Sequence, residues 1–277
     1  MNRRRFVGAA AAATIAALGV DAAWMEPGWL EVTRHRVPAP SGRRPFVFAQ
    51  ISDLHLRRVG RLHHRVAAEV ARARPRFILL TGDSVDRAST LPVLDEFLAL
   101  LPGVPKYATL GNWEHWSGVD LGELARVYAR HNCELLVNGS RHPEIDGTAI
   151  TISGLDDLVG IPDLRTALAG ADPTPVHLVM AHSPEYRDRI VAQAASGVDL
   201  TAITMILSGH THGGQVTLGG WAPLRPPGSG RYLRGWYRDD DAPPLYVSRG
   251  IGTSVLPLRF GARPELALFT VGPEVGG

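Results

Sequence analysis

The chain has 277 residues, of which 45% are hydrophobic and 20% are charged, and its formal net charge is +2. This length and balance exclude a disordered tail or a fibrous repeat and are typical of one large globular domain or two small ones. The single cysteine, Cys133, excludes an intramolecular disulfide framework.

Residues 1–23 are predicted to be an export signal or anchor. Three arginines, Arg3 to Arg5, precede Phe6 and a mild apolar run over residues 8–20. Paired arginines before an apolar stretch are typical of the twin-arginine route, so the twin-arginine export machinery is an expected partner. The run is shorter than the roughly 20 residues of a membrane span, which leaves cleavage and an uncleaved anchor both open. We expect an exported protein, periplasmic or on the outer face of the inner membrane.

Charge gives no indication of a nucleic-acid partner. Removing residues 1–23 takes away three arginines and one aspartate, which leaves the mature chain close to neutral. A nuclease would be expected to carry a basic groove, so we expect no nucleic acid as partner and disfavour a nuclease.

The first half of the chain predicts alternating strands and helices. Residues 24–45 form a polar lead-in with one edge strand at residues 30–36. Short apolar runs predict buried strands at residues 46–51, 77–80 and 107–110. Helical segments at residues 62–73, 91–101 and 121–129 follow them. This alternation indicates parallel strands, and we expect a single domain over residues 46–277.

The second half repeats this pattern less regularly. Strands are predicted at residues 135–137, 148–153, 176–180, 203–207, 245–248 and 266–271, with a short helix at 164–168. Residues 221–238 are rich in Pro, Gly, Arg and aromatic residues. They are either part of a substrate-binding mouth, with Arg231 and Arg234 as phosphate contacts, or a surface hairpin whose aromatics cover the core.

Residues able to bind metal follow several of the predicted strands. They are Asp53, His55, Asp83, Asn112, His182, His210 and His212. One such residue is usually a helix cap or a turn former, but seven at successive strand ends are not explained by capping. Ligands gather outside the carboxyl ends of parallel strands, so these side chains are expected to meet. Histidines and carboxylates without cysteine suit two divalent ions of Mn, Fe, Zn or Co.

The pattern of these residues resembles the signature of the calcineurin-like metallophosphoesterases. The resemblance covers about residues 46–271 and rests on Asp53 with His55, Gly82-Asp83, Gly111-Asn112, His182 and Gly209-His210-Thr211-His212. Residues 213–215 and 246–253 look more narrowly like a bacterial envelope branch. That branch includes twin-arginine-exported phosphoesterases and enzymes similar to UDP-2,3-diacylglucosamine pyrophosphatases.

The resemblance implies an α/β fold in which two mixed β-sheets pack together and are flanked by helices. It implies one metal site formed by Asp53, His55, Asp83 and His212. It implies a second site formed by Asp83, Asn112, His182 and His210, with Asp83 bridging the two. The family usually has a histidine directly after the Gly-Asn pair, where this chain has Trp113. His115, two residues later, is a candidate general acid in its place.

These observations predict a metal-dependent phosphoesterase of the cell envelope that uses a metal-bridging hydroxide. Its expected substrate is a phosphate ester, lipid-linked or glycan-linked, and association with a membrane surface is a further expectation. Two alternatives stay open. One is an enzyme resembling the UDP-2,3-diacylglucosamine pyrophosphatases of lipid A synthesis. The other is a catalytically weak metal-binding protein, which Trp113 favours.

Overall fold

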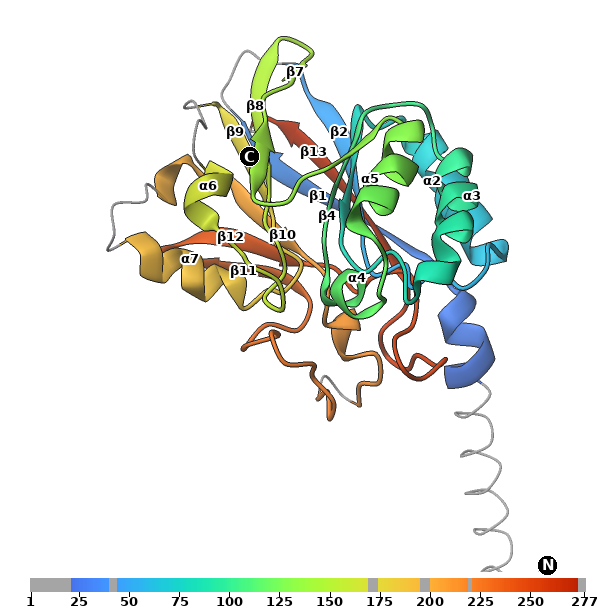
Figure 1. Cartoon of the computed structure of the whole chain (residues 1–277). Coiled ribbons are helices and arrows are strands. Elements are labelled where there is room, and N and C mark those ends of the chain that lie inside the picture. Colours follow the sequence, from blue (N-terminus) through green and yellow to red (C-terminus); the bar gives the residue numbers. More distant parts are fainter. Residues whose placement is uncertain (1–20, 40–43, 169–173, 195–199, 219–220, 274–277) are drawn as a thin grey trace, which may run out of the picture.

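The computed structural model describes residues 21–39, 44–168, 174–194, 200–218 and 221–273. Two mixed sheets face each other, and helices cover the outer side of each sheet (Figure 1). The predicted two-sheet α/β fold is therefore confirmed. Residues 1–20, which carry most of the predicted export signal, lie outside the described residues.

The first sheet has six strands. Their order is β1 (Glu31–Pro38), β13 (Glu265–Gly272), β2 (Phe46–Ile51), β3 (Phe77–Thr81), β4 (Lys106–Thr109) and β5 (Cys133–Leu135). Strands β2 to β5 run parallel, and the connections between them contain α2 (Arg61–Ala73), α3 (Leu91–Leu100) and α5 (Leu121–Arg130). The predicted edge strand is confirmed as β1, which pairs in parallel with β13.

The second sheet has seven strands. Their order is β11 (Gly235–Asp239), β12 (Ala242–Val247), β10 (Met205–Ser208), β9 (Val176–Met180), β8 (Thr148–Gly154) and β6 (Gly139–Arg141), with β7 (Glu144–Ile145) paired to β8. Strands β8, β9, β10 and β12 run parallel. The helices α6 (Leu164–Leu168) and α7 (Tyr186–Ala194) belong to this half of the molecule.

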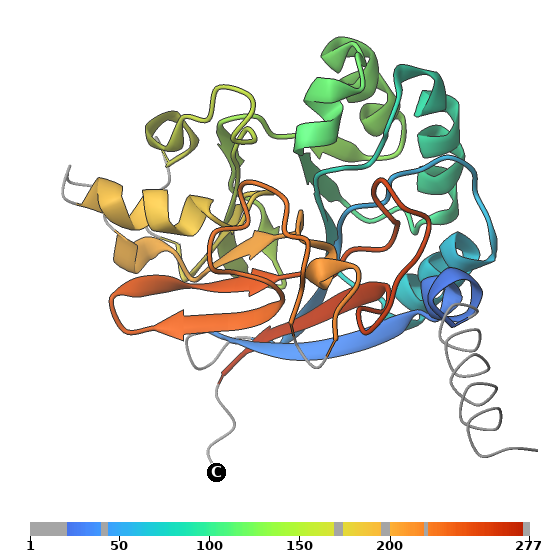
Figure 2. The same ribbon diagram turned by 90° about the horizontal axis from the view of Figure 1, so that it is seen from below.

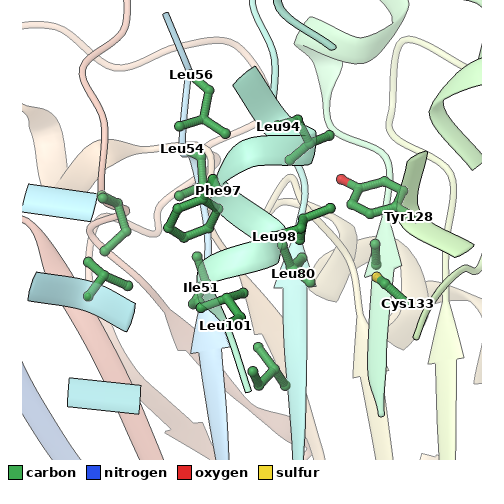
Figure 3. Packing of buried hydrophobic residues seen from close by; sticks show 14 of the residues in the cluster. Ile51, Leu54, Leu56, Leu80, Leu94, Phe97, Leu98, Leu101, Tyr128 and Cys133 are labelled. Carbon is green, nitrogen blue, oxygen red and sulfur yellow. The ribbon is translucent and has the colours of Figure 1, made fainter. Parts of the chain in front are cut away.

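Three buried clusters hold these layers together. One lies between the sheets, where Phe48 and Phe77 of the first sheet meet Ile152 and Leu178 of the second. Another packs α3 on the first sheet, with Phe97 and its neighbours lying over the strands (Figure 3). The third packs α6 and α7 on the second sheet. The long apolar runs of the strands are explained by this burial, because parallel strands are covered on both faces.

The carboxyl ends of the parallel strands in both sheets meet at one end of the molecule. The short helix α4 (Asn112–Trp116) follows β4 there, and the 3-10 turn η5 (His212–Gly214) follows β10. Both lie at the lower end in Figure 1, and Figure 2 looks onto that end from below. The residues predicted to bind metal follow the strands that end at this edge.

Several predicted boundaries differ from the structure by one to three residues, including those of β5, β10 and β12. Strand β5 ends at Leu135, two residues before the predicted end, because Leu136 and Val137 already leave the sheet. Strand β11 occupies the end of the segment at residues 221–238, and its partner β12 begins before the predicted start. Pro243 and Pro244 hid the start of β12, because proline cannot donate a ladder hydrogen bond and argues against a strand.

Candidate metal centre

The predicted ligands form two buried groups at the shared edge of the two sheets. Asp53, His55 and His212 make one group, and Asp83, His182 and His210 make the other, with the ligand atoms in each group within 4.8 Å of one another. Each group contains residues that follow strands of both sheets. The structure therefore brings together side chains that are up to 159 positions apart, counted from Asp53 to His212.

Asp83 lies between the two groups. Its Oδ2 atom is 3.6 Å from His55 Nε2 and 3.2 Å from His182 Nε2. On the other side, the Asn112 Oδ1 atom is 3.2 Å from His182 Nε2 and 2.8 Å from His210 Nδ1. This is the arrangement that the sequence resemblance implied, with Asp83 positioned to serve both groups and Asn112 positioned to complete the second.

Several polar atoms of the first group lack the hydrogen-bond partners that they need, and a cation could bind them instead. Asp53 Oδ2 is buried without a hydrogen-bond partner. The Nε2 atoms of His55 and His212 lie only 3.0 Å apart. A buried carboxylate oxygen without a donor is costly, and two facing imidazole nitrogens can share only one proton. A divalent ion bound by these three side chains would satisfy all of them, so the residues present fit a metal.

Hydrogen bonds on the far side of three imidazole rings fix their orientation. His182 Nδ1 donates to the Thr81 carbonyl oxygen at 2.7 Å, and His210 Nε2 donates to the Pro227 carbonyl oxygen at 2.7 Å. His55 Nδ1 donates to Asp86 Oδ1 at 2.5 Å. A histidine that donates from one ring nitrogen presents the lone pair of the other, so each ring offers one metal-binding atom inward.

The protonation of the ligands follows from their mutual contacts. Burial alone would raise the pKa of Asp83, but His182 and His55 lower it to about 2. Burial and the neighbouring His55 hold the pKa of His212 well below its ordinary value. Asp83 is therefore an anion and His212 a neutral base at neutral pH, which are the forms that bind metal.

Several of the predicted ligands have an uncommon backbone conformation, which they share with six other non-glycine residues of the described chain. Five of the ligands have a positive φ angle, which non-glycine residues rarely adopt. The values are 51° for Asp53, 42° for His55, 54° for Asp83, 71° for His210 and 51° for His212. Each such residue costs roughly 1–3 kcal/mol, and such residues cluster at functional sites. The fold thus accepts local strain in order to turn five side chains inward.

Three carboxylates of the site escaped the sequence analysis. Glu114 is buried in α4 and accepts backbone N–H groups of Asp83, Ser84 and Gly111, which ties two ligand loops together. Asp86 holds His55, and Asp157 accepts the Ser183 hydroxyl at 2.6 Å. Asp157 lies four residues after the predicted strand at residues 148–153, so its position near a strand end was the signal that could have identified it. Nothing local marked Glu114 or Asp86.

A cavity of about 670 Å³ opens beside the ligands. Asp83, Asn112, His210 and His212 lie in its wall, as does Asp157. This volume lies within the usual range of ligand pockets, roughly 300–1,000 Å³. The cavity is therefore large enough to admit a substrate to the ligand groups.

The indole of Trp113 takes part in the site. Its ring lines the cavity and meets the ring of His55 edge-on at 5.7 Å between centroids, and its backbone N–H donates to Asp83 Oδ1 at 2.9 Å. His115, by contrast, is not among the residues lining the cavity, and its Nε2 lies 2.7 Å from Asp156 Oδ1. A role for His115 as general acid stays a prediction.

The segment at residues 221–238 divides between the two expectations made for it. Leu224, Arg225 and the residues through Gly228 line the cavity. Tyr232 is buried against the second sheet, in agreement with aromatics that cover the core. Arg231 pairs with Asp239 at 2.8 Å, and Arg234 Nη1 donates to the Gly261 carbonyl oxygen at 2.6 Å. Neither arginine is among the lining residues, so their substrate contacts stay a prediction.

The sequence of the chain matches the family model described as calcineurin-like phosphoesterase over residues 46–214. This chain belongs to the calcineurin-like phosphoesterases. It is 31% identical to the uncharacterized metallophosphoesterase YkuE of Bacillus subtilis, with 98% of each chain covered. It is 28% identical to the phosphodiesterase YaeI of Escherichia coli, with 97% of this chain and 98% of that protein covered.

Solved structures agree with this membership at the level of the fold. The structure of GAP50, the anchor in the inner membrane complex of Plasmodium, superposes with a TM-score of 0.50 at 11% identity, covering 82% of this chain and 81% of that one. The calcineurin-like phosphoesterases are hydrolases of phosphoester bonds, and this chain has the two ligand groups that such chemistry needs. It is a hydrolase of that class.

Proposed function

We propose that this calcineurin-like phosphoesterase is a phosphodiesterase that works with two divalent transition-metal ions outside the cytoplasm. The observation that carries the proposal is the position of Asp83 Oδ2 between His55 Nε2 and His182 Nε2, at 3.6 and 3.2 Å. One carboxylate oxygen facing a histidine from each ligand group is the arrangement expected where two metals share a ligand. The relative named phosphodiesterase YaeI supports a diester as substrate.

The residues of the chain would hold the metals as follows. Asp53, His55 and His212 would bind the first ion, Asn112, His182 and His210 the second, and Asp83 both. When bound, two such ions neutralise the phosphoryl oxygens and lower the pKa of a water molecule that attacks phosphorus. The donors are nitrogen and oxygen only, which suits Mn, Fe, Zn or Co.

The side chains that line the cavity would determine how a phosphate ester reaches the ligand groups. Trp113 and Trp116 add apolar wall beside the ligands, which would lower the local dielectric and strengthen the electrostatic interactions made with a phosphate there. Asp157 is held by Ser183 and by the backbone N–H of Val159, so its carboxylate has a fixed direction at the cavity wall. A diester reaching Asp83 and Asn112 would pass these residues.

Export is the second part of the proposal. Its basis is the sequence of residues 1–23, with paired arginines followed by a short apolar run. None of the helices in the described part of the chain is long and apolar enough to span a bilayer. A fusion of residues 1–30 to a reporter that functions only outside the cytoplasm tests this part. Export that survives replacement of Arg3 and Arg4 by lysine would contradict use of the twin-arginine route.

The central experiment combines metal analysis with turnover. Purified full-length protein, reconstituted with manganese, should hold two ions per chain and hydrolyse bis-p-nitrophenyl phosphate. Asp83→Asn should lose metal and about 100-fold or more of the activity, because loss of the shared anion weakens both groups and each 1.36 kcal/mol costs tenfold.

Asp163→Asn is the matched control. Asp163 accepts from Thr166 in the first turn of α6 and does not line the cavity, so this variant should retain both metals and full turnover. A wild-type protein that holds one ion or none after reconstitution would exclude the two-metal proposal. Two bound ions without turnover of any diester would point instead to the metal-binding protein without catalysis.

A further inference from the structure

The opening of the cavity is surrounded by exposed apolar side chains. The part of the chain that the structure describes has twelve exposed large apolar side chains. Five of them line this one cavity, and we call them the apolar mouth: Trp116, Val159, Leu224, Val255 and Leu256. Val255 is 77% exposed and Leu224 is 68% exposed. Single exposed apolar residues are ordinary, but several gathered around one opening mark an interaction site.

The apolar mouth is assembled from four separate segments. Trp116 ends α4, Val159 follows β8, Leu224 follows η5, and Val255 with Leu256 lies between β12 and β13. Chance exposure of one loop does not explain this convergence.

The backbone at Val255 also has an unusual conformation. Val255 has a φ angle of 59°, in the left-handed region that a β-branched residue rarely adopts. Its side chain is nevertheless the most exposed in the mouth. A residue held in such a conformation without burial in return is typical of functional segments.

The described start of the chain is attached to the same loop. The Arg259 backbone N–H donates to the Ala22 carbonyl oxygen at 2.8 Å. The Glu26 carboxylate accepts the N–H groups of Gly261 and Ala262 at 2.9 and 2.7 Å. In Figure 1 the helix at residues 21–28 and the loops of the mouth lie at the lower end, and Figure 2 views both from below. The described residues from Asp21 on therefore start beside the loop that carries Val255 and Leu256, and the apolar run at residues 8–20 precedes them in the sequence.

We propose that the apolar mouth docks on a lipid bilayer and that the cavity takes its phosphodiester from an amphiphile in that bilayer. The substrate part rests on the proposed function, whereas the docking part does not. Exposed Arg225 lines the cavity among the apolar side chains and would face the anionic phosphates of the lipid surface. The apolar side chains would enter the region between headgroups and acyl chains.

A bilayer fits this surface better than a protein partner does. The mouth surrounds the entrance to the ligand groups, so a protein or a second copy seated on it would close the cavity to substrate. A bilayer covers the same apolar side chains and supplies a phosphodiester through the opening. The attachment of Ala22 and Glu26 to residues 259–262, next to Val255 and Leu256 in the sequence, agrees with this orientation.

Fluorescent labels at single cysteines test the docking without relying on activity. The native Cys133 is buried, and burial raises the pKa of its thiol, so it resists labelling. Leu224→Cys and Leu256→Cys place an environment-sensitive dye on the mouth. Val137→Cys is the matched control, an exposed apolar position that does not line the cavity. The full chain is mixed with vesicles of phosphatidylethanolamine and phosphatidylglycerol, with and without a quencher attached to the lipid.

Both mouth dyes should shift to shorter wavelength on vesicles and be quenched by the lipid-borne quencher, while the dye at residue 137 keeps its spectrum. Mouth dyes that stay unchanged on vesicles would overturn the proposal, even if the chain sediments with the vesicles through residues 8–20. A shift that needs no vesicles and grows with protein concentration would assign the mouth to a second copy and overturn it equally.

The substrate part has its own measurement. Across a series of alkyl p-nitrophenyl phosphates, KM should fall several-fold with each few methylenes added, because apolar surface is buried in the mouth. A KM independent of chain length would overturn the amphiphilic substrate while leaving the phosphodiesterase intact. Failure to hydrolyse any diester, with the mouth dyes still shifting on vesicles, would contradict the proposed function and leave the docking standing.

Discussion

At the scale of single residues, Asp86 is an example of a side chain that contacts a predicted metal ligand without being one itself. It does not face the cavity, yet it accepts from His55 Nδ1 at 2.5 Å and from Arg57 Nε at 3.0 Å. The anion fixes the ring of His55 and makes its Nε2 a better donor to a metal. Asp86 is therefore a positioning residue for the first ligand group.

We predict that Asp86→Ala weakens metal affinity of the first group by about 10- to 100-fold, the usual effect of removing such a partner. Metal titration of the full-length protein measures this. Asp95→Ala is the matched control. Asp95 Oδ1 lies 2.7 Å from the Nε2 atom of His131, and neither residue lines the cavity. Equal losses of affinity in the two variants would show that the effect belongs to general stability.

A second experiment tests whether His115 acts as the general acid. Since its Nε2 is engaged with Asp156 and the ring does not line the cavity, we expect His115→Ala to slow an alkyl diester and a nitrophenyl diester by the same factor. A general acid speeds poor leaving groups by roughly 10²–10⁴-fold and barely affects nitrophenolate. A selective loss on the alkyl diester would instead support the predicted role of His115 as general acid.

At the scale of elements, the loops that follow β2 and β10 approach so closely that Gly209 has no room for a side chain. A Cβ atom on Gly209 would overlap the Ser52 hydroxyl and the Asp53 carboxylate, which belong to the loop after β2. Gly209 is thus required by the close approach of the loops after β10 and β2. Its own backbone N–H donates to the His182 carbonyl oxygen at 3.0 Å, which adds β9 to the same junction.

We predict that Gly209→Ala separates these loops and abolishes binding at the first ligand group, because Asp53 and His212 would no longer approach each other. Metal analysis together with a melting curve measures it. Gly103→Ala is the control, since nothing lies within 4 Å of its added methyl group. Full metal content in Gly209→Ala would mean that the loops move apart without cost.

The sequence predicted the strand ends better than the contacts made around them. Strands such as β2 and β3 are continuous apolar runs, and the polar residues directly after them mark the edge where ligands gather. The structure brings all seven residues predicted in this way to that edge, six of them in the two groups that could hold an ion. Glu114 and Asp86 were not predicted, because each acts through partners about 30 residues away that no local pattern reveals. The five-residue helix α4 was likewise too short to show a period.

At the scale of the whole molecule, buried histidines outside the ligand groups link stability to pH. His177 lies on β9 with its Nε2 atom 2.9 Å from the Ser153 hydroxyl, and burial lowers its pKa to about 4. In the unfolded chain its pKa returns to about 6.5. Between these values the unfolded state binds a proton that the folded state does not, so stability falls as the pH falls.

We predict that metal-free protein loses up to about 3 kcal/mol of stability through His177 between pH 6.5 and pH 4. Above pH 6.5 the imidazole is neutral in both states and contributes no pH dependence. His177→Gln keeps a hydrogen-bonding side chain but cannot titrate, so its urea-unfolding free energy should fall less over this window. Identical slopes for variant and wild type would place the acid sensitivity elsewhere, for example at His63, whose pKa burial also lowers to about 4.

The division of the ligands between the two sheets has a consequence for synthesis of the chain. The loops after β2, β3 and β4 present Asp53, His55, Asp83 and Asn112, but the second group is complete only when His210 has emerged, and the first only when His212 has. A nascent chain that has emerged only as far as β5 lacks these histidines and can bind metal at most weakly. Metal binding at these groups would therefore require that the strands of both sheets have already come together. If the protein is exported as proposed, metal loaded in the cytoplasm would be bound only by chains that have folded.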